Sequence, residues 1–239
     1  TGLGNQSDDI VFPIVGEPVA FHDGPGLQTS RVYVGDEGGR LWRIDVSDLD
    51  PTEWTMEVVH DAYAGEPLDS RVRRPVTLAP AVVEDQGRDV IVVYATGDPD
   101  DLSSFQTNHK VHSLREVFEV SGAERSFEEM AVNWRIDLQI GEVATGRPLV
   151  FDEVVYFSSF SKSGASVCSR GEGRIWAVDF VGLASDVDAD PTENVIPRFP
   201  TNDVQNRNGF VMFSPPLCSD DGENANPNDL ERASLYCVL

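Results

Sequence analysis

The sequence predicts an all-β fold, a β-propeller of which about four four-stranded blades are present as part of a larger ring. Three observations lead to this prediction. Apolar and polar residues alternate with a period of two, glycine-containing turns join the alternating segments, and the resulting hairpins recur along the chain. Tyr33 and Tyr94 are 61 positions apart, and Tyr94 and Tyr156 are 62 positions apart. A repeat of this length with about four strands has the content of one propeller blade.

The first repeat, expected at about residues 30–60, contains a tight hairpin. Gly38 and Gly39 follow a strand that ends at Asp36, and they supply the positive φ that a tight turn needs. In the strand after the turn, alternate residues fall on one face, namely Trp42, Ile44 and Val46. We therefore expect a strand with at least one buried face.

The second repeat, expected at about residues 75–122, is built around the continuous apolar run 90–95. Such a run is typical of a strand that is buried on both faces. A short strand is expected before it at 80–83, and the chain returns through 112–120. The segment Glu124 to Val132 is compatible with two turns of helix, for which Ser121 or Ser126 would be the cap.

The third repeat is expected at about residues 130–182, where alternation resumes. Its expected strands are 133–138, 149–151, 154–160 and 173–180. Trp42 in the first repeat and Trp134 and Trp176 in the third repeat occupy strand positions that point inward, so we expect them in the core and not stacked on a ligand.

Residues 183–239 are rich in Asp, Asn and Pro, and they predict a loop-rich partial blade with strands near 209–213 and 233–239. A blade cannot bury both faces alone, so blades stack and close into a ring. Either residues outside this chain complete the ring, or divergent strands in 1–30 and 181–239 close it. We expect the first arrangement.

The charge balance excludes two classes of partner. The chain carries 18 Lys and Arg against 41 Asp and Glu, which gives a formal net charge of −23. Nucleic acids and anionic lipids need clustered basic residues, so neither is expected to bind. An apolar run of about 18 residues, long enough to span a membrane, is also lacking, and no membrane insertion is expected.

Three cysteines, Cys168, Cys218 and Cys237, form no CxxC pair, so a zinc site is not expected. One disulfide with one free thiol, or three buried thiols, are both consistent with this number. The histidines are scattered, and His109 and His112 have no third ligand nearby in the sequence.

Several motifs of this sequence follow one another in the same order as in the C-terminal propeller of the PilY/PilC family, which the chain therefore resembles. Members of that family are type IV pilus biogenesis factors and tip adhesins. The family carries segments of the form VYxGDxxGxLWRxD, which residues 32–45 match closely. A Pro-containing entry and an apolar strand follow at 75–82 and 94–97, then further motifs at 133–138, 154–160 and 175–179 with Cys168 between them. The resemblance covers about residues 30–180 and depends on the order of the motifs, since each motif alone is common.

This resemblance implies a non-enzymatic bacterial protein at the cell surface or pilus tip. Its expected partners are minor pilins and other pilus tip proteins, host or surface ligands, and the rest of its own propeller. Loops on a rigid scaffold would carry recognition, and the loops 98–110, 161–172 and 181–208 are expected to make the contacts.

A calcium site is a candidate at Asp186, Asp188, Asp190 and Asn194, because alternating oxygen ligands in a curled loop suit this hard cation. Pro191 stands where such loops usually have glycine, and a solvated acidic loop explains the same residues. The acidic loop at 220–224 is a weaker candidate. The family's own calcium loop, before the first repeat, would fall at 22–30, where Asp23 is the only carboxylate, so that site is not transferred.

The sequence contains none of the common catalytic signatures, such as GxSxG, HExxH or a Walker loop. Two alternatives to an adhesin remain open. One is a quinoprotein dehydrogenase of the propeller class, which binds pyrroloquinoline quinone. The other is a structural component of a surface layer or filament.

Overall fold

The structure is a computed structural model that describes residues 5–6, 10–24, 27–71, 74–101, 107–121, 124–161, 172–182, 210–213 and 234–237. Strands dominate these residues, and the helical element among them is a single 3₁₀ turn, η1 (Leu68–Arg71). In the described part of the chain, no helix is long and apolar enough to cross a membrane.

The first sheet is an antiparallel meander with a fifth strand added at its outer edge. It contains β2 (Val19–His22), β3 (Thr29–Gly35), β4 (Arg40–Asp45) and β5 (Thr55–Asp61) in sequential order. The two-residue strand β1 (Asn5–Gln6) pairs with β5 in parallel. The predicted tight turn joins β3 to β4, and Gly39 has a φ of 83° there.

The second sheet repeats this meander with longer outer strands. Its order is β6 (Ala81–Glu84), β7 (Val90–Ala95), β8 (Lys110–Ser121) and β9 (Glu124–Asp137). All six residues of β7 are buried, as the continuous apolar run predicts.

The third sheet is built around β12 (Val154–Ser161). On one side β12 pairs with β13 (Glu172–Asp179), and on the other side with both β10 (Glu142–Ala144) and β11 (Leu149–Phe151). Two further strands, β14 (Phe210–Phe213) and β15 (Ser234–Cys237), form a separate antiparallel hairpin.

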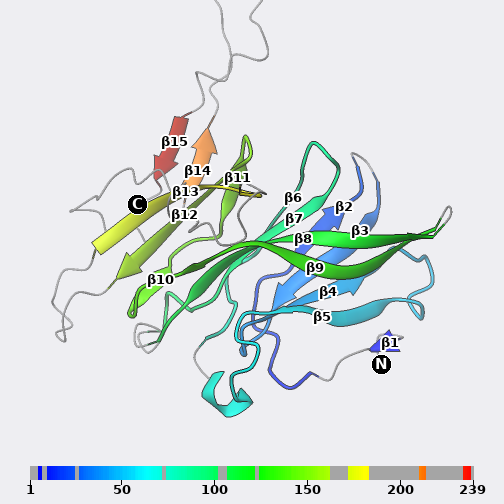
Figure 1. Ribbon diagram of the computed structural model, residues 1–239, viewed down its shortest axis with the longest axis horizontal. Helices are drawn as coiled ribbons and strands as arrows, with labels where there is room; N and C mark the ends of the chain where they lie inside the picture. Colours follow the sequence, from blue (N-terminus) through cyan, green and yellow to red (C-terminus); the bar gives the residue numbers. More distant parts are fainter. Residues whose placement is uncertain are drawn as a thin grey trace, which may run out of the picture.

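The arrangement of these sheets is β-propeller-like (Figure 1). The innermost strands β2, β6 and β11 lie next to one another, with β6 in the middle. Tyr33, Tyr94 and Tyr156 lie on β3, β7 and β12, the strand that follows the innermost strand in each sheet. The tyrosine repeat therefore marks the same strand in successive sheets, although Tyr33 and Tyr94 face each other across one core. The series of antiparallel sheets confirms the predicted fold class.

Two hydrophobic cores hold the three sheets together. The core between the first and second sheets includes Tyr33, Leu41, Val92, Tyr94 and Leu114. The core between the second and third sheets includes Ile91, Val111, Trp134, Ile136, Phe157 and Phe180. Because β7 alternates between them, both of its faces are covered.

The three tryptophans predicted to be in the core, Trp42, Trp134 and Trp176, lie in or against cores. Trp42 is fully buried with Val34 and Met56 on the other face of the first sheet. Trp134 is buried, and the half-buried Trp176 stacks on Phe157 with ring centroids 5.5 Å apart.

The segment 124–132 is not a helix, because it forms the first part of β9 and pairs with β8. Glu128 and Asn133 have no register partner on β8 and mark two bulges. Phe127 and Met130 face the first sheet and Trp134 faces the third. In the sequence the three residues are three and four positions apart, a spacing that also fits a helix.

The sheet boundaries also differ from the expected blades. The three meanders span 19–61, 81–137 and 142–179, compared with the expected 30–60, 75–122 and 130–182. Residues 130–137 belong to the second sheet, since β9 continues the ladder of β8 to Asp137. Of the expected partial blade at 183–239, the described residues show only the hairpin β14–β15.

Candidate ligand-binding groove

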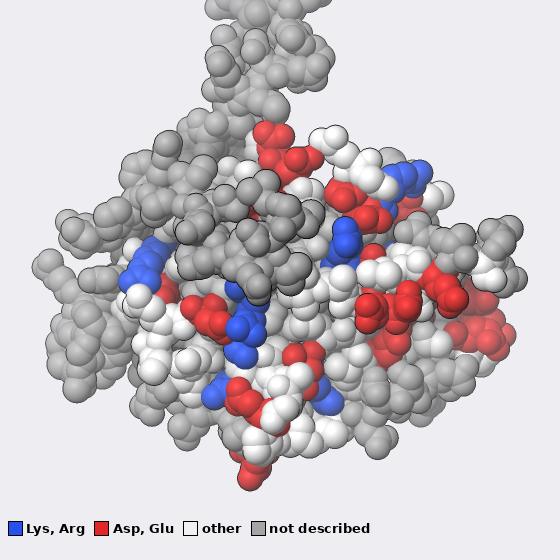
Figure 2. Space-filling model, viewed as in Figure 1, with Lys and Arg blue, Asp and Glu red and all other residues white. Residues whose placement is uncertain are grey.

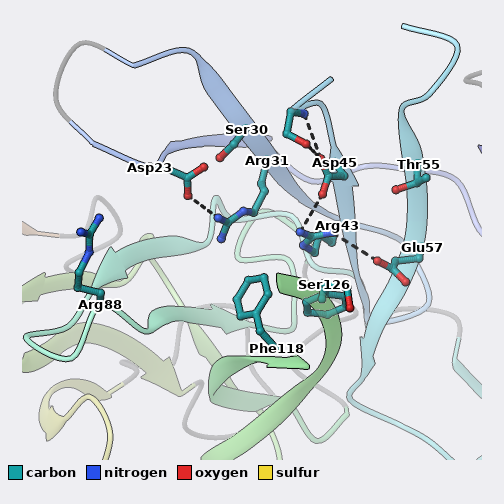
Figure 3. A pocket seen from close by; sticks show the side chains of 12 residues that line it. Asp23, Ser30, Arg31, Arg43, Asp45, Thr55, Glu57, Arg88, Phe118 and Ser126 are labelled. Atoms are coloured by element: carbon teal, nitrogen blue, oxygen red, sulfur yellow. Dashed lines mark hydrogen bonds and ion pairs between the residues drawn. The ribbon is translucent and has the colours of Figure 1, made fainter. Parts of the chain in front are cut away.

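An open polar groove follows the seam between the first and second sheets (Figure 3). It consists of two adjoining cavities of about 610 and 450 Å³, which share the lining residues Asp23, Arg31, Arg88 and Phe118. The smaller cavity reaches the innermost strands at Phe21 and Glu84, and the larger one reaches the outer strands at residues 55–57 and 126–127. The groove thus runs from the inner to the outer edge of the two sheets.

Strand pairing explains why polar residues line this seam. Arg43 lies opposite Tyr33 on β3 and opposite Glu57 on β5, so all three side chains share the face toward the second sheet. Two residues before Tyr33 on β3, Arg31 lies opposite Asp45 on β4, on this same face. The side chains of the first sheet that face the second sheet therefore change from apolar to charged along the strands. The charged ones lie at the end of the sheet where β3 begins.

Beneath the floor of the groove lies a buried carboxylate that holds both arginines. Glu116 on β8 is 2% exposed and accepts hydrogen bonds from Arg31 Nη1, from the Tyr33 hydroxyl and, at 3.0 Å, from Arg43 Nε. A buried charge is tolerated when it is paired and fully hydrogen-bonded. Glu116 consequently ties β3 and β4 of the first sheet to β8 of the second.

The buried carboxylate affects the ionisation of the two groups that donate to it, Tyr33 and Arg43. Burial, followed by the charge and hydrogen bond of Glu116, raises the pKa of the Tyr33 hydroxyl far above its ordinary value, so this group remains a donor. Burial is the largest influence on Arg43 and opposes its charge, but the charges of Glu116 and its other partners together with the hydrogen bond to Glu116 outweigh burial, so the pKa of Arg43 is raised.

Carboxylates at the rim complete the pairing of the arginines. Arg43 donates to Asp45 at 3.1 Å and to Glu57 at 3.4 Å, and Arg31 donates to the half-exposed Asp23. Partial burial opposes the charge of Asp45, but hydrogen bonds from Ser47 and the charge of Arg43 bring the pKa of Asp45 below its ordinary value.

Aromatic rings position the two guanidinium groups. The Arg31 guanidinium lies 5.2 Å from the ring centroid of Phe21 and 5.6 Å from that of Phe118. The Arg43 guanidinium lies 4.3 Å from the centroid of Phe127. Cation–π contacts and ion pairs therefore hold both arginines in one orientation.

A second polar cluster lies at the opposite end of the first sheet. Asp36 is fully buried and accepts hydrogen bonds from the backbone of Gly38 and from the side chains of Arg40 and Trp42, at 2.9, 2.7 and 2.9 Å. The third sheet has a related arrangement, in which Arg174 donates to Glu142 and Trp176 donates to Ser159. These contacts fix turns and strand ends, so we assign them a structural role.

A third cluster contains two histidines between the first and second sheets. His60 Nδ1 lies 2.6 Å from the Tyr94 hydroxyl, and the buried His112 ring stacks on Tyr94 with centroids 5.3 Å apart. Burial is the largest cause that lowers both pKa values, to about 4 for His60 and well below the ordinary value for His112. Both rings are therefore neutral at pH 7.

The residues predicted as a calcium site, Asp186, Asp188, Asp190 and Asn194, lie outside the described residues, as does the acidic loop 220–224. Among the residues that are described, no group of three or more His, Cys, Asp or Glu side chains is placed to hold a metal ion. The calcium site stays a sequence prediction.

Of the loops predicted to make contacts, the described residues of the loop 98–110 do not line the groove. The loop 98–110 leaves β7 at Ala95 and returns at Lys110, whereas the groove lies near the other ends of β7 and β8, at Val90 and Phe118. Most of 161–172 and nearly all of 181–208 lie outside the described residues. The groove was missed because its signal, charged residues at inward-facing strand positions, is visible only after the strands are paired.

The comparisons with known proteins show a structural similarity but no family or sequence match. No family model matches the chain, and no curated protein sequence matches it. Among solved structures, the chain is similar to the crystal structure of the Pseudomonas aeruginosa PilY1 C-terminal domain, with a TM-score of 0.47 and 14% sequence identity. The match covers 69% of this chain and 46% of that one, so this chain spans about half the length of the protein it matches.

Proposed function

We propose that this chain is a non-enzymatic recognition segment of a type IV pilus-associated protein at the bacterial cell surface. Its role would be to dock on minor pilins at the pilus tip and to contact external surfaces. The mechanism is recognition by loops and by the groove at the sheet seam, both of which are held by rigid sheets. Further blades of the same propeller are a third expected partner.

One observation carries this proposal: the sequence motifs that resemble the PilY/PilC family fall on corresponding strands of successive sheets. The motif at residues 32–45 forms the β3–β4 hairpin, and the motifs at 154–160 and 175–179 form β12 and β13. Tyr33, Tyr94 and Tyr156 each lie on the second strand of their sheet. The order of the motifs thus follows the order of the sheets, which supports their origin in one propeller.

Binding to minor pilins tests the proposal directly. The purified chain is immobilised, and the minor pilins of the source bacterium and its major pilin are passed over it separately. We expect saturable binding of at least one minor pilin and none of the major pilin. Binding of neither pilin class would contradict the proposal.

A second measurement separates the proposal from the quinoprotein alternative. The chain is incubated with pyrroloquinoline quinone and Ca²⁺, desalted, and examined by absorbance. We expect no retained absorbance of the quinone. Stoichiometric retention together with oxidation of an alcohol in the presence of an electron acceptor would establish the enzyme instead.

A further inference from the structure

We propose that the groove between the first and second sheets binds a neutral, polyhydroxylated ligand, that is, an uncharged carbohydrate chain. The inference rests on the proposed recognition function and names the ligand class of the groove. Three properties of the groove lead to it: its charges are already paired, its lining offers both donors and acceptors, and its floor includes aromatic rings (Figure 3).

Each charged side chain that lines the groove has an ion-pair partner within it. Arg31 pairs with Asp23 and with Glu116 beneath the floor, and Arg43 pairs with Glu116 and two rim carboxylates. Arg88 pairs with Glu84 at 2.9 Å. An anion would therefore have to compete with these carboxylates for the arginines, and it would also meet a chain with a net charge of −23.

The overall charge pattern of the surface agrees with this reading. Figure 2 shows basic side chains next to acidic ones on the visible face of the molecule, without a separate basic patch. In the groove, three arginines face five carboxylates when Glu116 is included. The groove therefore keeps a local charge of −2, which disfavours an anion, while a cation would meet a guanidinium beside each of these carboxylates.

Hydroxyl groups suit such a lining because each one both donates and accepts. A carboxylate that already binds an arginine keeps acceptor sites on its oxygens, and a hydroxyl can use them without breaking the ion pair. The hydroxyl side chains that line the groove add partners of the same kind, namely Ser30, Ser47, Thr55 and Ser126. Adjacent hydroxyls of a sugar ring can in this way bridge a carboxylate and a protein hydroxyl.

Two rings supply the apolar surface that the C–H face of a sugar needs. Phe118 lines both cavities, and Phe127 lines the larger one. Their centroids are 6.1 Å apart in an edge-to-face arrangement. The negative face of an aromatic ring attracts weakly positive C–H groups, which gives orientation without charge.

The size and shape of the groove fit more than one sugar unit. The larger cavity, about 610 Å³, falls within the range of ordinary ligand pockets, which is about 300–1,000 Å³. The second cavity adjoins it through the four shared lining residues Asp23, Arg31, Arg88 and Phe118. A chain of sugars could therefore run along the seam between the two sheets.

Calorimetric titration of the full chain with defined probes tests the inference. The neutral probes are cellotetraose, maltotetraose, chitotetraose and lacto-N-tetraose, the anionic probe is 3′-sialyllactose, and the cationic probe is tetralysine. We expect at least one neutral probe to bind more tightly than both charged probes. Binding of only a charged probe, or of no probe at millimolar concentration, would overturn the inference.

Two matched variants place the binding in the groove. Asp23→Asn removes an exposed carboxylate from the groove rim, and Asp100→Asn removes an exposed carboxylate at the other end of the second sheet. For the neutral probe we expect about tenfold weaker binding in the first variant and no change in the second, because a hydrogen bond to a charged acceptor is lost. Equal affinities in both variants would overturn the assignment to the groove.

A further variant changes the aromatic floor. Phe118→Ala should weaken binding of the neutral probe about five- to tenfold while circular dichroism shows a folded chain. Unchanged affinity in a folded variant would overturn the role of the ring. Minor-pilin binding is also measured for the Asp23→Asn variant. Pilin binding that persists while carbohydrate binding is lost distinguishes this inference from the proposed function.

Discussion

At the residue scale, Glu116 connects the two sheets that form the groove. Its carboxylate is buried and accepts from Arg31, Arg43 and Tyr33, so it balances two cations that are themselves largely buried. Removing one member of such a group leaves an uncompensated charge, which costs more than the pair contributes. The site thus depends on one carboxylate for its geometry and for its stability.

Glu116→Gln should therefore destabilise the chain strongly. We expect a loss of about 3 kcal/mol in the free energy of unfolding, measured by urea denaturation at pH 7. Glu119→Gln is the control, because Glu119 lies on the same strand but is exposed, and we expect a change of about 0.5 kcal/mol or less. Similar effects of the two substitutions would show that Glu116 is not buried in an ion-pair network.

His60 and His112, which lie between the first and second sheets, make the stability of the fold depend on pH. Burial lowers both pKa values below the ordinary value of 6.5, and Lys110 and Arg135 nearby lower that of His112 further, whereas Asp61 partly opposes the shift of His60. The unfolded chain therefore binds more protons than the folded chain as the pH falls below 6.5. Stability is fully present above about pH 6.5 and is lost as the pH falls toward 4.

His112→Phe tests this pH dependence while keeping an aromatic ring beside Tyr94. Between pH 7 and pH 5 one buried histidine contributes a loss of about 2 kcal/mol, so the variant should lose that much less stability than the unmodified chain. His22→Gln is the control, since His22 is exposed. An unchanged pH dependence in His112→Phe would contradict the neutral, buried state of this residue.

At the scale of elements, the β3–β4 turn depends on a close approach as well as on a glycine conformation. Gly39 has a φ of 83°, and a Cβ there would lie 2.7 Å from the ring of Tyr63. Gly65 has a similar φ of 87° but nothing within 4 Å. The two positions therefore separate backbone strain from crowding.

Alanine at these two glycines should have unequal effects. Gly65→Ala should cost about 1 kcal/mol, which is the cost of a left-handed conformation for alanine. Gly39→Ala should cost about 1–3 kcal/mol more, because it also crowds a packed ring. Thermal and urea unfolding of both variants give these values, and equal losses would mean that Tyr63 does not pack on the turn.

Some strands could be predicted from the sequence, whereas the strand β9 and the groove could not. The strand around Tyr33 follows from alternation and a glycine turn, and the strands around Tyr94 and Tyr156 follow from their apolar runs. The strand β9 does not, because the bulges at Glu128 and Asn133 interrupt its period of two. The groove could not be predicted either, since it brings Arg31 and Glu116 together across 85 positions of sequence.

At the scale of the whole molecule, consecutive sheets pack face to face around their innermost strands (Figure 1). This stacking creates the cores on both faces of the second sheet and leaves the polar groove at one seam. The proposed recognition role and the proposed carbohydrate ligand both require that the first two sheets are held rigidly against each other. The central claim is therefore the packing of β3 on β8.

A double-mutant cycle between Tyr33→Phe and Glu116→Gln tests this claim most directly. The two residues lie on different sheets, and the Tyr33 hydroxyl donates to the Glu116 carboxylate. Urea unfolding of the parent, both single variants and the double variant should give a coupling free energy of about 1–3 kcal/mol. A coupling of zero, with both single variants folded, would show that the two sheets do not meet at this seam.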